Sequence, residues 1–147
     1  MSDPCYLEVS DANAIALLNR NIEGPVSMLN LLRFKSVADY SDHRQLAPAS
    51  AISGRDAYDR YINHTIPFLT ESGGELLYLG TGGSYLIGPE DEGWDLVMLV
   101  RQQSIAAFMA FAENTEYLKG IGHRDAALQD SRILPLQDRP AEAANVA

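Results

Sequence analysis

Tyrosine and histidine side chains recur at helical spacing in one segment of the chain and suggest acid–base chemistry. Tyr58, Tyr61 and His64 lie three residues apart, which on a helix places them along one side. His123 is a further candidate, because imidazole titrates near neutral pH. We predict that Tyr61, His64 and His123 are catalytic groups for proton transfer on a small aromatic or enol substrate, with Tyr58 contacting the ligand. The alternative is that the tyrosines belong to the core and His64 faces solvent.

Polar residues within apolar strands are the candidate ligand contacts. Asn30 lies in the middle of MLNLL, where its amide either orients a substrate carbonyl or is satisfied by a neighbouring loop or helix end. Arg33 and Arg101 follow two apolar segments, which we take to be parallel central strands. Both guanidiniums would then lie at one end of the sheet, where they either clamp a ligand carboxylate or pair with acidic residues of this chain.

A second polar group flanks the end of the last predicted helix. His123, Asp130 and Ser131 supply a base, an acid and a hydroxyl, but the serine is in no G-x-S-x-G turn and the three residues crowd together. We therefore expect caps and ion pairs here rather than a hydrolase triad. Arg132 is kept as a candidate ligand contact.

The sequence has no pattern typical of a metal or nucleotide site. The histidines lack metal-ligand spacing, and the glycines at 80, 82 and 83 do not complete G-x-G-x-x-G. We expect no cofactor, although haem ligation by His64 or His123 stays open.

Two segments must form the middle of a sheet, because residues 26–34 and 94–100 are apolar on both alternating faces. Short strands are predicted at 75–79 and 84–87, joined by a glycine turn at 80–83, and an edge strand at 132–136. Helices are predicted after Ser10 or Asp11, after Ser53, after Ser104 and after Thr115. Pro67 should kink or divide the second helix.

This order of elements is typical of the split βαβ fold, an α+β class with a four-stranded antiparallel sheet. We predict a single domain over 1–147, with an extra N-terminal helix at 10–22, a ferredoxin-like core at 24–136 and a flexible tail at 137–147. Residues 35–52 form a long loop that can cover a cavity. Since one chain's helices cover only one face of the sheet, we predict a homodimer of the dimeric α+β barrel kind.

Composition restricts the function classes. The 147 residues include 11 Lys and Arg against 20 Asp and Glu, a formal charge of −9, which argues against a nucleic-acid partner. No apolar run approaches the roughly 20 residues of a membrane span, and no leader is expected. The single cysteine, Cys5, cannot form an intrachain disulfide, which favours the cytoplasm.

Several separate segments of the sequence resemble, in the same order, segments of one bacterial family. MLNLLRFK, SGRDAYDRY, WDLVMLV and EYLKGIGHRDAALQDSRILPL look like the family catalogued as domain of unknown function 1330, over roughly residues 24–136. The resemblance implies a ferredoxin-like fold and a dimeric α+β barrel, in a wider clan of cofactor-independent monooxygenases, isomerases, haem enzymes and proteins without known activity. It implies no chemistry for this chain.

Two functions therefore remain open. One is a cofactor-independent oxygenase or isomerase acting on a small apolar or aromatic compound, in a cavity lined by Asn30, Tyr61, His64, Arg101 and His123. The other is a ligand-binding or structural homodimer without turnover.

Overall fold

Four antiparallel strands form one sheet in the computed structural model, which describes residues 5–139. The strands are β1 (Val26–Phe34), β2 (Glu75–Ser84), β3 (Gly93–Gln102) and β4 (Leu128–Gln137). Their order in the sheet is β2-β3-β1-β4, so the first and third strands are central. The predicted ferredoxin-like α+β fold is confirmed by this order and by the helices that follow β1 and β3.

The helices begin largely where side chains can cap them. They are α1 (Asp11–Asn19), η1 (Arg44–Leu46), α2 (Gly54–Glu71), α3 (Ile105–Ala112), α4 (Thr115–Leu118) and α5 (Ile121–Ala127). Ser10, Ser53 and Ser104 each accept a hydrogen bond from the backbone N–H three residues later. The predicted cap at Thr115 is wrong, since Asn114 caps α4. Pro67 does not divide α2, which continues through it to Glu71.

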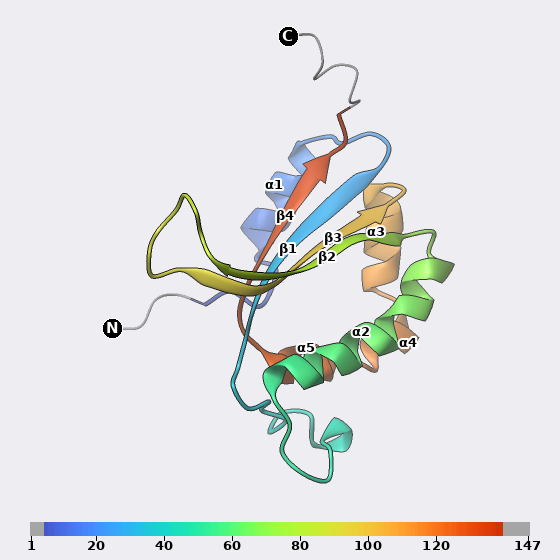
Figure 1. Cartoon of the computed structure of the whole chain (residues 1–147). Helices are drawn as coiled ribbons and strands as arrows, with labels where there is room; N and C mark the ends of the chain where they lie inside the picture. The colour runs from blue at the N-terminus through green and yellow to red at the C-terminus, as the bar shows by residue number, and fades with distance from the viewer. Residues whose placement is uncertain (1–4, 140–147) are drawn as a thin grey trace.

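Only one face of the sheet carries the main helical layer. Figure 1 shows α2 and α5 packed together on one side of the strands. Leu32 and Met98 point into this side and belong to the buried core, together with Tyr58 of α2. Their strand neighbours Leu31 and Val97 are paired across β1 and β3 on the opposite face and are half-buried. We call this opposite face the open face.

The hairpin before β3 differs from the prediction. Residues 80–83 do not form a turn, because β2 continues through them to Ser84 and the chain turns at residues 85–92. A Cβ atom on Gly82 would lie 2.3 Å from the carbonyl oxygen of Trp94. Glycine at this position therefore allows a close approach of two strands rather than a reversal of the chain.

Residues 35–52 are held against the end of the helical layer. The N–H groups of Lys35 and Asp39 donate to the carbonyl oxygens of Ala127 and Ala126, at the end of α5. Tyr40 is buried in the core. These contacts make the loop a fixed part of the helical side. Of the predicted tail at 137–147, Gln137 belongs to β4, and residues 140–147 lie outside the described part of the chain.

Gly54 offers a direct test of this packing. A Cβ atom at this position would lie 2.2 Å from the carbonyl oxygen of Lys35 and 2.7 Å from that of Ala127. We expect Gly54→Ala to lower the free energy of unfolding by about 2 kcal/mol or more, because backbone atoms on both sides must shift. Urea denaturation measures the change.

The matched control is Gly83→Ala, because a Cβ atom on Gly83 meets nothing within 4 Å. It should stay within about 0.5 kcal/mol of the wild type. Equal losses in the two variants would contradict the proposed clash.

Candidate functional site

The predicted pairing of Arg33 with Arg101 is wrong, because β1 and β3 run antiparallel. Arg101 lies opposite Ser27 at the start of β1, whereas Arg33 lies near the end of that strand. The two guanidiniums are therefore at opposite ends of the sheet. Arg101 forms an ion pair with Asp138, with 3.1 Å between Nη2 and Oδ2.

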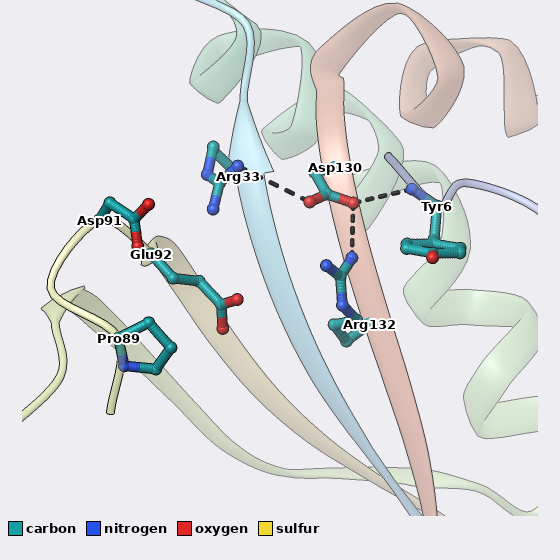
Figure 2. Close-up of a pocket in the computed structure, with 7 residues that line it drawn as sticks. All are labelled: Tyr6, Arg33, Pro89, Asp91, Glu92, Asp130 and Arg132. Atoms are coloured by element: carbon teal, nitrogen blue, oxygen red, sulfur yellow. Dashed lines mark hydrogen bonds and ion pairs between the residues drawn. The ribbon is translucent and has the colours of Figure 1, made fainter. Parts of the chain in front are cut away.

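Arg33 instead shares a carboxylate with Arg132. Asp130 lies opposite Arg33 in the β1–β4 register, and Arg132 is two residues further along the same face of β4. Oδ1 of Asp130 accepts a hydrogen bond of 2.6 Å from Nη1 of Arg132, and Oδ2 lies 3.6 Å from Nη1 of Arg33. Figure 2 shows the two arginines on either side of this carboxylate. Because Leu32 faces the helices, this group lies on the open face.

Asp130 is buried yet held in its ionised form. Its side chain is 3% exposed, and burial opposes ionisation. The N–H of Tyr6, the Arg132 guanidinium and the N–H of Ser131 outweigh burial and hold the pKa of this carboxyl below its ordinary value. Tyr6 is brought here from the segment that precedes α1, with 2.8 Å between its N–H and Oδ1.

An aromatic and acidic group from the β2–β3 hairpin completes the site. The guanidinium carbons of Arg33 and Arg132 lie 4.8 Å and 5.0 Å from the centre of the Trp94 ring. The indole N–H of Trp94 donates to the Tyr85 hydroxyl at 2.7 Å, and that hydroxyl donates to Glu92 at 2.5 Å. The hydrogen bond from Tyr85 lowers the pKa of Glu92, so this carboxylate is ionised at neutral pH.

A hollow of about 350 Å³ lies among these residues. It is lined by Tyr6, Arg33, Pro89, Asp91, Glu92, Asp130 and Arg132. Figure 2 shows the strand residues on one side and the hairpin residues on the other. The hollow therefore has a floor from β1 and β4 and a wall from residues 89–92.

The tyrosines predicted for catalysis and binding lie in the core on the helical face. Tyr58 is 1% exposed, and burial raises the pKa of its hydroxyl. The Tyr61 hydroxyl lies 2.7 Å from that of Tyr117, and burial raises the pKa of Tyr117 as well. Tyr58 and Tyr117 therefore remain protonated at neutral pH, and all three tyrosines are buried.

The two predicted catalytic histidines contact neighbouring protein groups. Nε2 of His64 donates to the carbonyl oxygens of Glu116 and Tyr117, at 2.9 Å and 3.1 Å. Nδ1 of His123 lies 2.7 Å from the Tyr40 hydroxyl. Burial, followed by the charges of Arg60 and His64, lowers the pKa of His123 and keeps its ring neutral.

Asn30 is satisfied within its own strand. Its Nδ2 donates to the carbonyl oxygen of Met28 at 3.0 Å, in a buried position. The residues predicted to line one cavity therefore do not lie together. Asn30 and Arg101 are on the strands of the sheet. Tyr61 and His64 are on α2 and contact α4, and His123 is on α5. Arg33 and Arg132 are the predicted ligand contacts that the structure brings together.

Sequence reasoning did not identify Trp94, Glu92 and Tyr6 as parts of a site. Trp94 falls in a predicted apolar strand, while Glu92 and Tyr6 lie outside the predicted helices and strands. Asp130 was named as an acid expected to form ion pairs, and it does so with Arg33 and Arg132. Its alternation with Arg132 along a strand places both side chains on one face.

Residues 5–139 contain neither a metal-binding cluster nor a membrane-spanning helix. Within this range, no group of three or more His, Cys, Asp or Glu side chains is placed to hold a metal ion. No helix of the described residues is long and apolar enough to cross a bilayer.

Comparisons with known proteins identify two solved structures that are similar to this chain over most of its length. No family model matches the sequence, and no curated protein matches it, so membership of the domain of unknown function 1330 family is not confirmed. The RPA0582 protein of Rhodopseudomonas palustris, described as a protein of unknown function, is 31% identical, with a TM-score of 0.79, 92% of this chain covered and 98% of the other. The methylated form of that protein is 32% identical to this chain, with a TM-score of 0.79. The match covers 92% of this chain and 97% of the methylated protein.

A more distant structure is that of a dimeric protein of unknown function and ferredoxin-like fold from Bacteroides fragilis. It is 7% identical to this chain, with a TM-score of 0.49. The match covers 80% of this chain and 99% of the other. The likeness to RPA0582 extends over nearly the full length of both chains at more than 30% identity. The chain therefore belongs to the same family as the RPA0582 protein of Rhodopseudomonas palustris.

Proposed function

We propose that this chain is a small-molecule-binding homodimer, in which two open faces pack together as a dimeric α+β barrel. The support comes from the apolar side chains on the open face. Leu29 and Leu99 lie opposite each other at its centre and are half-buried, while Leu134, on the neighbouring strand, is 54% exposed. Contiguous apolar surface of this kind is typical of protein interfaces. As the sequence suggests, we place the dimer in the cytoplasm.

The binding function rests on one observation, the pair of arginines around a buried carboxylate at the floor of the hollow. The Asp130 carboxylate orients both guanidiniums, and each retains N–H groups that it does not use on the described residues. Small-molecule sites typically combine a concave surface with a few fixed polar groups. The hollow has this combination, with Tyr6 and Pro89 as its less polar lining.

A cofactor-independent oxygenase or isomerase remains the alternative. The observation that favours it is the neutral ring of His123 beside the Tyr40 hydroxyl, because a general base must be unprotonated. The candidates His64 and Tyr61, however, are hydrogen-bonded to α4 residues, and the hollow lies on the other face of the sheet. We therefore place binding ahead of catalysis.

The dimer is tested by a charge on the open face. We expect light scattering at micromolar concentration to give twice the monomer mass for the wild type. Leu134→Glu should shift the protein towards monomer, with association weakened about tenfold or more, because a carboxylate would be buried without a partner.

The control is Leu118→Glu on α4, where the side chain is 41% exposed on the helical side. This variant should remain dimeric. A monomeric wild type, or equal dissociation of both variants, would rule out packing through the open face.

The hollow is tested with three compounds that share one ring, namely benzoate, benzamide and aniline. In ligand-observed NMR, we expect at least one to bind the wild type. Arg132→Gln should weaken that binding about tenfold, the typical effect of losing a hydrogen bond to a charged group.

Arg101→Gln provides the matched control, because Arg101 is at the opposite end of the same face. Binding should survive this change. If none of the three compounds binds, or if both variants weaken binding equally, the hollow is not the ligand site.

A further inference from the structure

We infer that the hollow selects a small aromatic monocarboxylate, which the free guanidinium edges of Arg33 and Arg132 bind. This inference rests on the proposed function, since it assumes that the hollow is a ligand site. It goes further by giving the chemical class of the ligand and by assigning a role to Glu92.

The floor of the hollow carries more positive than negative charge. Two guanidiniums face a single buried carboxylate, that of Asp130. Glu92 is within electrostatic range of both arginines but forms an ion pair of 4 Å or less with neither among the described residues. The floor alone therefore has one positive charge that Asp130 does not balance, and an anion can pair with it. The whole lining, with Asp91 and Glu92 of the wall, has three carboxylates against two guanidiniums, so the anion must compete with these wall carboxylates.

Within the described residues, both guanidiniums also have N–H groups that form no hydrogen bond. Arg132 uses Nη1 for Asp130 and for the carbonyl oxygen of Ser131, at 2.6 Å and 2.8 Å. Arg33 uses Nε for the carbonyl oxygen of Gly93 at 3.0 Å and places Nη1 towards Asp130. Within residues 5–139, Nη2 of Arg33 has no hydrogen-bond partner. A carboxylate matches the planar fork of a guanidinium better than other common anions of this size.

The rim restricts the charge of the anion. Asp91 and Glu92 line the wall opposite the arginines, as Figure 2 shows. Their carboxylates repel a ligand that carries several negative charges, such as a nucleotide or a polyphosphate. A ligand with one negative charge meets the arginines and can keep its neutral part near the acidic rim.

The size and the lining favour a single flat ring. A hollow of about 350 Å³ is at the lower end of ligand sites, which typically range from about 300 to 1,000 Å³. Tyr6 is 54% exposed and, in Figure 2, lies on the opposite side of the hollow from Pro89. These two rings provide the surfaces against which an aromatic ligand packs.

Glu92 acts as the internal competitor of the ligand. Its carboxylate belongs to the hairpin wall and is held by the Tyr85 hydroxyl at 2.5 Å. Its negative charge attracts the same arginines that the ligand needs and repels the ligand carboxylate. Removal of this charge should therefore strengthen binding of an acid while leaving a neutral ligand unaffected.

The test is a titration of the full chain with benzoate and with benzamide, followed by backbone amide chemical shifts. We expect benzoate to bind at least about tenfold more tightly than benzamide, because benzamide has the same ring but no charge. Glu92→Gln should tighten benzoate binding about threefold to tenfold, as expected for one charge at short range near the surface. Arg33→Gln should weaken it.

Glu90→Gln is the matched control, since Glu90 lies in the same turn, is exposed and does not line the hollow. It should leave the benzoate affinity unchanged. A gain in affinity on Glu92→Gln cannot arise from misfolding, which makes it the decisive variant.

Any of the following results would overturn the inference. Equal binding of benzamide and benzoate would exclude selection of the charge, as would tighter binding of aniline. An equal gain in Glu90→Gln and Glu92→Gln would show a general effect of net charge rather than a competitor in the hollow. If only benzamide or aniline binds, and that binding depends on Arg132, the proposed function stands and the inference about the ligand class is wrong. If none of the ring compounds binds, both the proposed function and the inference are wrong.

Discussion

The alternation of side chains along the two central strands determines most of this structure. Leu32 and Met98 face the helical layer, so the residues beside them must face the other way. Because α2 and α5 cover only the first of these faces, every odd-numbered residue of β1 is committed to the open face. Arg33 belongs to this set, which places its charge on the uncovered side and at the end of the strand.

Local patterns were sufficient to predict most of the elements, but the strand predicted at 84–87 is wrong, because β2 ends at Ser84 and the chain then turns. They did not predict all of the connections. The apolar segments and the serine caps depend on residues within a few positions of one another, and they are found as predicted. The direction of β3 relative to β1 depends on the whole path of the chain, and the error there misplaced Arg101. The glycines at 80, 82 and 83 were misassigned because the same residue type serves a tight turn and a close contact between strands.

The site was only partly predictable for a related reason. Arg33 was identified because it follows an apolar strand, and Arg132 because it belongs to the polar group after the last helix, where ion pairs were expected. That Arg33 would share the Asp130 carboxylate of this group was not predicted. The ionised state of Asp130 depends on the N–H of Tyr6, which is 124 residues away in the sequence. In the same way, helical spacing placed Tyr61 and His64 on α2, while the groups that engage them come from α4. No local pattern contains such contacts.

One face can serve both as an interface and as a binding site because its polar and apolar parts are separate. The leucines that pair across β1, β3 and β4 occupy the middle of the open face, while Arg33 and Asp130 lie where β1 ends. A partner that covered the middle would bury apolar side chains, which is favourable, and would leave the charged group at the margin. Partial removal of water there would also strengthen the attraction between a ligand carboxylate and the guanidiniums, since a lower local dielectric raises the energy of each charge pair. The same face of the sheet can therefore form the dimer interface and also bind a ligand carboxylate.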